Sequence, residues 1–308
     1  MSNPTFTVFT ATYNRVACIH RVFESLQAQT LRDFEWVVVD DGSDDDTEEV
    51  VGKFASEAPF PVRYFRKEHA GKPAAWNLGV SEAHGRFFVS ADSDDAFLPQ
   101  SLERLFSMWE SIPESQKPRF RGVSCRCLDE SGSVVGDKDF PEPYLDAGSP
   151  DVVFKYGAGY EMWGMNRTDV LREYPMPEIQ GLSFYPELII WDKMSQSYVS
   201  RFFNEPLRII YDDQENKTTS KVGNTRFREN YLLWKHYLND MGGYFRFNPQ
   251  LFCKAAVGAM RDGLLCGMPR GGFSKTSILC GSRSLCFSEA QSPLCWQGEI
   301  SSEFHRFW

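Results

Sequence analysis

The chain has 308 residues, enough for one large domain or two modest ones, and its 42% hydrophobic content is ample for a packed core. Its 33 Lys and Arg residues against 42 Asp and Glu residues give a net charge of −9, which argues against nucleic acid or an anionic membrane as a general partner. No stretch approaches the roughly 18 apolar residues that cross a bilayer, and the first residues lack signal-peptide features. We therefore expect a cytoplasmic protein with reduced cysteines.

Short apolar strands and amphipathic helices alternate along about the first hundred residues. Strand-forming residues gather at 6–10, 35–39, 62–65 and 87–91, and apolar residues at three- and four-residue spacing lie between them, as at Val16, Ile19, Val22, Phe23 and Leu26. This alternation predicts an α/β fold with a mostly parallel sheet and helices on both faces. Because ligands of such sheets bind beyond the carboxyl ends of the strands, we expect the chemistry there.

Polar side chains follow each of the four predicted strands. The segments are Thr12-Tyr13-Asn14-Arg15, Asp40-Asp41-Gly42-Ser43, residues 67–72, and Asp92-Ser93-Asp94-Asp95. Three carboxylates within four residues repel one another unless a cation lies between them, so the last segment indicates either a divalent cation site or a solvated acidic turn. The four segments together suit a nucleoside diphosphate. Tyr13 would stack on the base, Asp41 would accept from a base imide or ribose hydroxyl, Lys72 would meet a phosphate, and Asp92 or Asp94 would hold a metal bridging both phosphates.

Five motifs occur in order along this half: Phe6-Thr7-Val8-Phe9-Thr10-Ala11-Thr12-Tyr13-Asn14-Arg15, Ser25-Leu26-Gln27-Ala28-Gln29-Thr30, residues 37–47, Trp76-Asn77-Leu78-Gly79, and Asp92-Ser93-Asp94-Asp95. In this order and spacing they resemble the family 2 glycosyltransferases of GT-A fold, a Rossmann-like α/β architecture. Ala11 departs from the family pattern, because many relatives carry Pro there.

The resemblance implies an inverting transfer of a sugar from a UDP-sugar or other nucleotide-sugar donor, with Mn²⁺ or Mg²⁺ as cofactor. The acceptor would be a hydroxyl of a saccharide or a lipid-linked saccharide, as in bacterial surface polysaccharide synthesis, and the sugar a hexose or N-acetylhexosamine. Asp41 would touch the base, and Asp92 and Asp94 stand where the metal-binding D-x-D of the family lies. The expected donor-site residues are Thr12, Tyr13, Asn14, Asp41, Lys72, Asn77, Asp92 and Ser93.

Glu187 opens the apolar run 187–191 and is the candidate general base. In the resembled family an acidic residue, commonly in a Glu-Asp pair, begins a helix beneath the acceptor site. Counting back from the strand-like 202–207 puts Glu187 at that position, although Pro186 and Leu188 flank it here. The alternative role for Glu187 is that of a helix cap, whose negative charge compensates the helix dipole. Asp192 and Glu178 are the alternative bases.

The later chain is less regular, and we divide the sequence into a donor-binding half at 1–112, an acceptor-binding half at 113–215 and a mainly helical region at 216–308. The middle part contains an expected hairpin at 122–135, a loop at 144–150, and an aromatic block at 156–167 whose Tyr160 and Trp163 either hold sugar rings or pack in a core. Helices are expected at 227–240 and 249–267. The aromatic residues of the tail 274–308 either graze a membrane, which would make the association peripheral, or pack against the protein.

Two other classes of protein fit part of the pattern. A nucleotide-sugar-binding module without turnover would keep Asp41 and Asp94 but would need no base. A sugar nucleotidyltransferase would want a glycine-rich basic loop after the first strand, and Thr12-Tyr13-Asn14-Arg15 contains no glycine.

Overall fold

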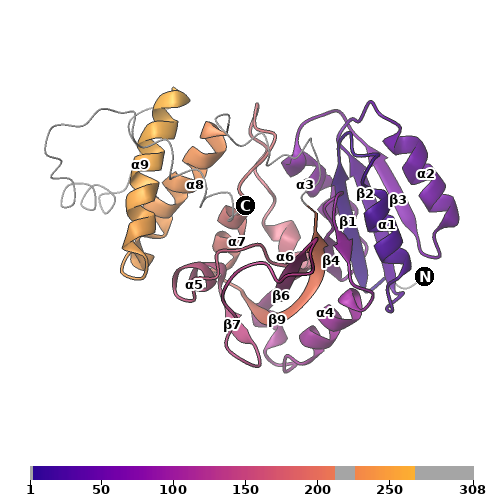
Figure 1. Ribbon diagram of the computed structural model, residues 1–308, viewed down its shortest axis with the longest axis horizontal. Helices are drawn as coiled ribbons and strands as arrows, with labels where there is room; N and C mark the ends of the chain where they lie inside the picture. Colours follow the sequence, from indigo (N-terminus) through magenta and orange to yellow (C-terminus); the bar gives the residue numbers. More distant parts are fainter. Residues whose placement is uncertain (1–2, 212–225, 268–308) are drawn as a thin grey trace, which may run out of the picture. The chain divides into compact units, whose positions relative to one another are not determined.

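The computed structural model describes residues 3–211 and 226–267, which form two compact units (Figure 1). Within the described residues, the first unit comprises 3–149 and 162–211, and the second comprises 150–161 and 226–267. The sequence-based division placed 150–161 with the acceptor-binding half, whereas in the structure this segment packs with the second unit. The expected boundary at 215–216 and the tail 274–308 lie outside the described residues.

The first half of the sheet is parallel, as the alternating sequence pattern predicts. Its strands, in spatial order β3-β2-β1-β4, are β3 (Val62–Arg66), β2 (Phe34–Asp40), β1 (Phe6–Thr12) and β4 (Phe87–Ser90). The connecting helices are α1 (His20–Gln27), α2 (Thr47–Glu57) and α3 (Lys72–Glu82), and α4 (Ser101–Glu110) follows β4. Every residue of β2 is buried, which explains its continuous apolar run.

The second half of the sheet is mixed. It adds β8 (Trp163–Arg167), β6 (Phe120–Asp129), β9 (Val199–Ile210), β5 (Ala96–Phe97) and β7 (Leu145–Ala147), which makes nine strands among the described residues. β6 runs parallel to β9, while β8, β5 and β7 pair antiparallel with their neighbours. The short helices of this half are η1 (Lys117–Arg119), α6 (Thr168–Glu173) and α7 (Glu187–Met194). At the expected hairpin, β6 is followed by a turn whose return segment pairs with it through one isolated bridge, between Leu128 and Val134. The expected loop at 144–150 contains the short strand β7.

Aromatic side chains fill the core of the first unit. Phe87 packs edge-on against Trp109 with ring centroids 5.0 Å apart, and Trp163 stacks on Phe97 at 4.7 Å. The Trp163 indole nitrogen donates to the carbonyl of Ser90 at 2.6 Å, and the side chain is 4% exposed. Of the two roles that the sequence left open for Trp163, the structure therefore supports core packing.

The helices of the second unit are α5 (Ser149–Phe154), α8 (Phe227–Asp240), η3 (Gly242–Tyr244) and α9 (Pro249–Leu265). The first residue of α5, Ser149, is assigned to the first unit. The two helices that the sequence predicts here are α8 and α9, and α9 ends two residues earlier than expected. Phe154 packs against Tyr237, Tyr244 and Phe252 with ring centroids 5.1–5.6 Å apart. Among residues 3–211 and 226–267, no helix combines the length and apolar character that crossing a bilayer requires.

Candidate functional site

The carboxyl ends of β1 to β4 meet at one edge of the first unit, and the loops there are bonded to one another. The Asp41 amide donates to the Thr12 carbonyl at 2.9 Å, and the Asn14 amide donates to Ser43 Oγ at 2.9 Å. Asn14 has a positive φ of 53° and accepts from the Asp44 amide at 3.0 Å. Asn is among the residues that tolerate this conformation. Thr12 and Asn14 therefore hold the first two loops together.

The Asp41 carboxylate is the anchor of the loop after β3. It accepts from three donors of that loop, the Lys67 ammonium at 2.7 Å and the amides of Ala70 and Gly71 at 3.0 and 2.8 Å, and His69 Nδ1 lies 2.9 Å from it. A carboxylate offers about four lone-pair positions, so these contacts use its acceptor capacity. In this conformation Asp41 shapes the loop, and a direct bond from Asp41 to a base would compete with these contacts.

Tyr13 and His69 form a ring stack at the same edge. Their centroids are 4.3 Å apart with the planes inclined by 28°, and Tyr13 is 43% exposed. His69 Nδ1 lies 3.1 Å from the Asp41 carbonyl in addition to its contact with the carboxylate. The stack thus presents exposed aromatic surface beside the Asp41-anchored loop, and the stacking of a base on Tyr13 stays a prediction.

The segment before α7 is fastened to α3. Gly71 has φ of +93°, and a Cβ there would lie 2.7 Å from the Ser183 backbone, while the Lys72 amide donates to the Ser183 carbonyl at 3.0 Å. The Asn77 amide group donates to the Met176 carbonyl and to Glu178, each at 2.8 Å, and accepts from the Met176 amide at 2.9 Å. Asn77, expected in the donor site, therefore has the contacts of a residue that positions the approach to α7.

Lys72 joins the acid at the start of α7 to the acidic cluster after β4. Its ammonium lies 3.1 Å from Asp92 Oδ1 and 3.1 Å from Glu187 Oε1. Burial favours the neutral amine, but the two carboxylates outweigh it and raise the pKa of Lys72 above its ordinary value. Burial likewise raises the pKa of Asp92, but Lys72 and Arg208 outweigh it and hold that pKa well below the usual range. Both groups are charged at neutral pH.

Arg208, near the end of β9, is a cation of this site that the sequence did not single out. Its guanidinium donates to Asp92 at 2.9 Å and, through Nε, to Asp95 at 2.5 Å. Arg208 is 7% exposed and Asp95 is 2% exposed. The two Asp92 oxygens thus have separate cations, Lys72 on one and Arg208 on the other. The alternation of apolar and polar residues along β9 does not indicate this role. Arg208 and Asp92 are more than a hundred residues apart, and the order of the strands in the sheet brings them together.

Asp94 has the carboxylate that best suits a divalent cation. Its carboxylate lies 3.6 Å from Arg15, a looser contact than those of Asp92. In residues 3–211 and 226–267, no group of three His, Cys, Asp or Glu side chains could hold a metal alone. Mg²⁺ bound with nucleotides commonly uses one or two carboxylates and takes its other ligands from phosphates and water. The residues present fit a metal of that kind, held through Asp94.

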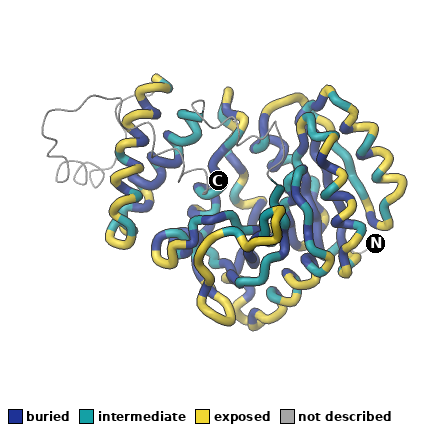
Figure 2. Tube along the Cα trace, in the orientation of Figure 1, coloured by how far each residue is buried: buried dark blue, intermediate teal, exposed yellow. Residues whose placement is uncertain are grey.

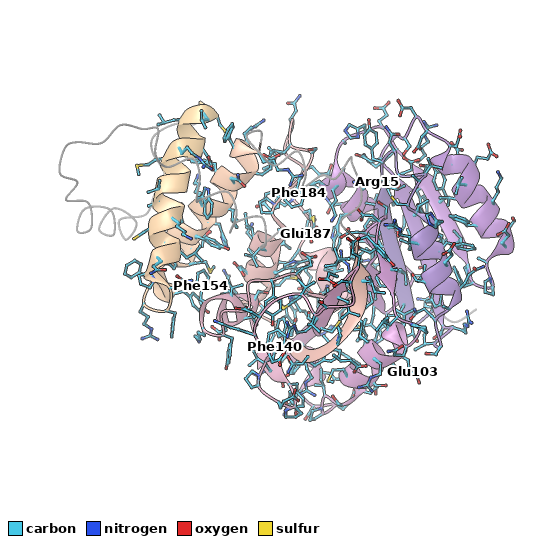
Figure 3. The ribbon with its side chains drawn as sticks, viewed as in Figure 1. Arg15, Glu103, Phe140, Phe154, Phe184 and Glu187 are labelled. Carbon is cyan, nitrogen blue, oxygen red and sulfur yellow. The ribbon has the colours of Figure 1, made fainter. Side chains whose placement is uncertain are left out.

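The candidate bases differ in accessibility. Glu187 lies in the first turn of α7 and keeps a side-chain exposure of 27%, whereas Asp192 on the same helix is 2% exposed. Glu178 is engaged by Asn77. Figure 3 labels Glu187 and Arg15 at the edge where the strands end, and Glu103 at the opposite end of the unit. Thr12 and Ser93, both expected in the donor site, are 3% and 8% exposed, so both residues are largely covered in this conformation.

The sheet, the carboxylates beyond its strand ends and Glu187 at the start of α7 together are typical of the GT-A glycosyltransferase fold. The fold is similar to that of S. aureus TarS 1-349 in complex with UDP-GlcNAc, with a TM-score of 0.60 and 16% identity over 86% of this chain and 73% of that one. It is also similar to the mannosyltransferase PcManGT from Pyrobaculum calidifontis in complex with GDP-Man and Mn²⁺, with a TM-score of 0.54 and 17% identity over 92% and 80% of the two chains. At these identities the likeness establishes the fold.

Residues 7–116 match the family model described as Glycosyl transferase family 2, so this segment is similar to the members of that family. An uncharacterized glycosyltransferase of Rickettsia felis is 37% identical over 91 residues, which is 30% of this chain. This chain matches only 15% of the length of that relative. The sequence-based recognition of the family and of the GT-A fold is therefore confirmed.

Proposed function

We propose that the chain is an inverting glycosyltransferase that moves a sugar from a UDP-sugar to a hydroxyl of a saccharide or lipid-linked saccharide acceptor. The observation that carries this proposal is the position of Lys72, 3.1 Å from both Asp92 and Glu187. One ammonium thereby connects the carboxylates expected at the diphosphate with the carboxylate expected at the acceptor. The donor's anomeric carbon would lie between these two groups, which is what a single displacement requires.

The donor site is assembled from four loops. The exposed Tyr13 and His69 rings offer stacking surface for the base, and Asp41 keeps the loop that carries His69 in place. Lys72 and Arg208 provide positive charge where the diphosphate is expected. A divalent ion bound through Asp94 and the phosphates would supply further positive charge for the leaving diphosphate. UDP-GlcNAc in TarS and GDP-Man with Mn²⁺ in PcManGT support a nucleotide sugar and a metal here.

The proposed step forms one bond and breaks another. The acceptor oxygen attacks the anomeric carbon while the bond from that carbon to the phosphate oxygen breaks, and UDP leaves with the electron pair. Glu187 takes the acceptor's proton, a role that its place on the first turn of α7 and its partial exposure allow. Lys72 and Arg208 stabilise the negative charge that develops on the diphosphate. One displacement on the face opposite the leaving group inverts the anomeric centre.

The test replaces Glu187 with Gln, which keeps the side chain's shape and removes the base. We expect turnover to fall by roughly 10²–10⁴, the usual contribution of a general base, with donor binding and melting temperature nearly unchanged. Glu103→Gln is the matched control, because Glu103 also lies in the first turn of a helix, α4, away from the site. Its turnover should equal that of the wild type.

Two results would contradict the proposal. If Glu187→Gln lost stability but kept its rate per folded molecule, Glu187 would be a helix cap. If the wild type bound UDP but showed neither transfer nor donor hydrolysis across a panel of nucleotide sugars with Mn²⁺, the chain would be a binding module.

A further inference from the structure

The outward face of α9 carries large apolar side chains that no described residue covers. Val257, Met260 and Leu264 follow one another at three- and four-residue spacing, which places them on one side of the helix, and we call these three residues the α9 stripe. They are 51%, 53% and 61% exposed, and the neighbouring Leu265 is 58% exposed. Figure 2 shows exposed positions recurring along this helix.

The opposite face of α9 is already used for packing against α8. Ala255, Gly258 and Ala259 are buried, and a Cβ on Gly258 would lie 2.5 Å from the Trp234 indole nitrogen. Asp262 is fully buried and accepts from that indole nitrogen at 3.0 Å and from Arg261 at 2.6 Å. The small residues and the buried acid fix which face meets α8, so the α9 stripe points away from the core of its own unit.

Cations border the α9 stripe. Lys254 and Arg261 are exposed and seven residues apart, which places them on one flank of the helix two turns from each other. Within α9 the one carboxylate is that of Asp262, which is buried and bonded to Arg261 Nε at 2.6 Å, while the Arg261 side chain remains 53% exposed. An apolar stripe flanked by Lys and Arg is the pattern of a surface that lies in the interface of an anionic bilayer.

We infer that the α9 stripe docks on an anionic lipid surface, with Val257, Met260 and Leu264 entering the interface and Lys254 and Arg261 meeting lipid phosphates. The net charge of −9 does not prevent this, because charges more than about 8 Å away are screened at physiological ionic strength. A second copy fits less well. Antiparallel pairing centred on the α9 stripe would set the Arg261 side chains of the two copies near each other, two like charges. The inference is independent of the proposed function.

The test measures partition of the full chain onto phosphatidylcholine vesicles with and without phosphatidylglycerol. We expect binding to the anionic vesicles that weakens as salt is added. The combined change Val257→Gln, Met260→Gln and Leu264→Gln should lower the partition coefficient at least about tenfold, because three apolar side chains no longer enter the interface. Lys254→Gln should lower it about fivefold on anionic vesicles only, the effect of one cation near such a surface.

Val134→Gln is the matched control, because Val134 is also an exposed valine, 43% exposed, but belongs to the first unit. Its partition should equal that of the wild type. Equal binding by the triple variant and the wild type would overturn the inference. Failure of the wild type to bind anionic vesicles would overturn it as well. In that case, a wild type that self-associates and a triple variant that does not would assign the α9 stripe to a second copy. If both were monomers, the stripe would be assigned to residues 268–308 or to another protein.

Discussion

Replacing Arg208 with Met tests whether the buried cation at the end of β9 holds the acidic cluster together. Arg208 and Asp95 are 7% and 2% exposed, and Arg208 Nε donates to Asp95 at 2.5 Å. Methionine keeps much of the volume and removes the charge, which leaves the Asp95 carboxylate buried without this cation. Breaking a buried pair by removing one partner costs about 3–5 kcal/mol, so we expect the first unit to lose stability on that scale.

Arg104 and Glu205 give the matched comparison, because they form the same kind of pair at the surface. Arg104 Nε lies 2.9 and 3.1 Å from the two Glu205 oxygens, and the side chains are 44% and 33% exposed. Exposed pairs contribute about 0.2–1 kcal/mol. Arg104→Met should therefore cost several-fold less than Arg208→Met, although the geometry of the two pairs is similar.

Urea unfolding followed by tryptophan fluorescence, with unchanged m values, measures both losses. Adding Asp95→Asn to Arg208→Met should recover at least half of the loss, because the buried charge is then gone. Equal costs for Arg208→Met and Arg104→Met, or no recovery in the double variant, would refute the reasoning.

Two further predictions concern the donor site. Asp94→Ala should abolish stimulation of transfer by Mn²⁺ and leave the fold intact, since its side chain is 18% exposed and its contact with Arg15 is a loose one of 3.6 Å. Near-normal metal-stimulated transfer would remove Asp94 from the metal site, and Asp44→Ala in the neighbouring loop is the control. Asp41→Ala should weaken UDP binding in calorimetry by about 1–3 kcal/mol and should also increase protease cleavage near residues 67–71, because Ala70 and Gly71 lose their acceptor. Unchanged affinity together with unchanged cleavage would place the base elsewhere.

Local pattern was sufficient for the parallel half of the fold. Apolar periodicity is a property of neighbouring residues, so the strands β1 to β4 and the helices between them could be read directly from the sequence. Because parallel strands present their carboxyl ends at one edge of the sheet, the sequence also predicted that Tyr13, Asp41, Lys72 and Asp94 lie at the same edge. The order of the later strands, with β8 between β4 and β6, had no local signal because it depends on pairing between distant segments.

The residue types at the strand ends follow from the sequence alone, whereas the contacts of each side chain depend on the tertiary structure. Arg208 reaches Asp92 across 116 positions, and Asn77 reaches Met176 across 99, so neither contact follows from spacing. Trp163 could equally hold a sugar or fill a core until Phe97 and the Ser90 carbonyl were found against it. Ion pairs and ring contacts depend on where separate loops are brought together, and the packing of the whole sheet fixes that arrangement.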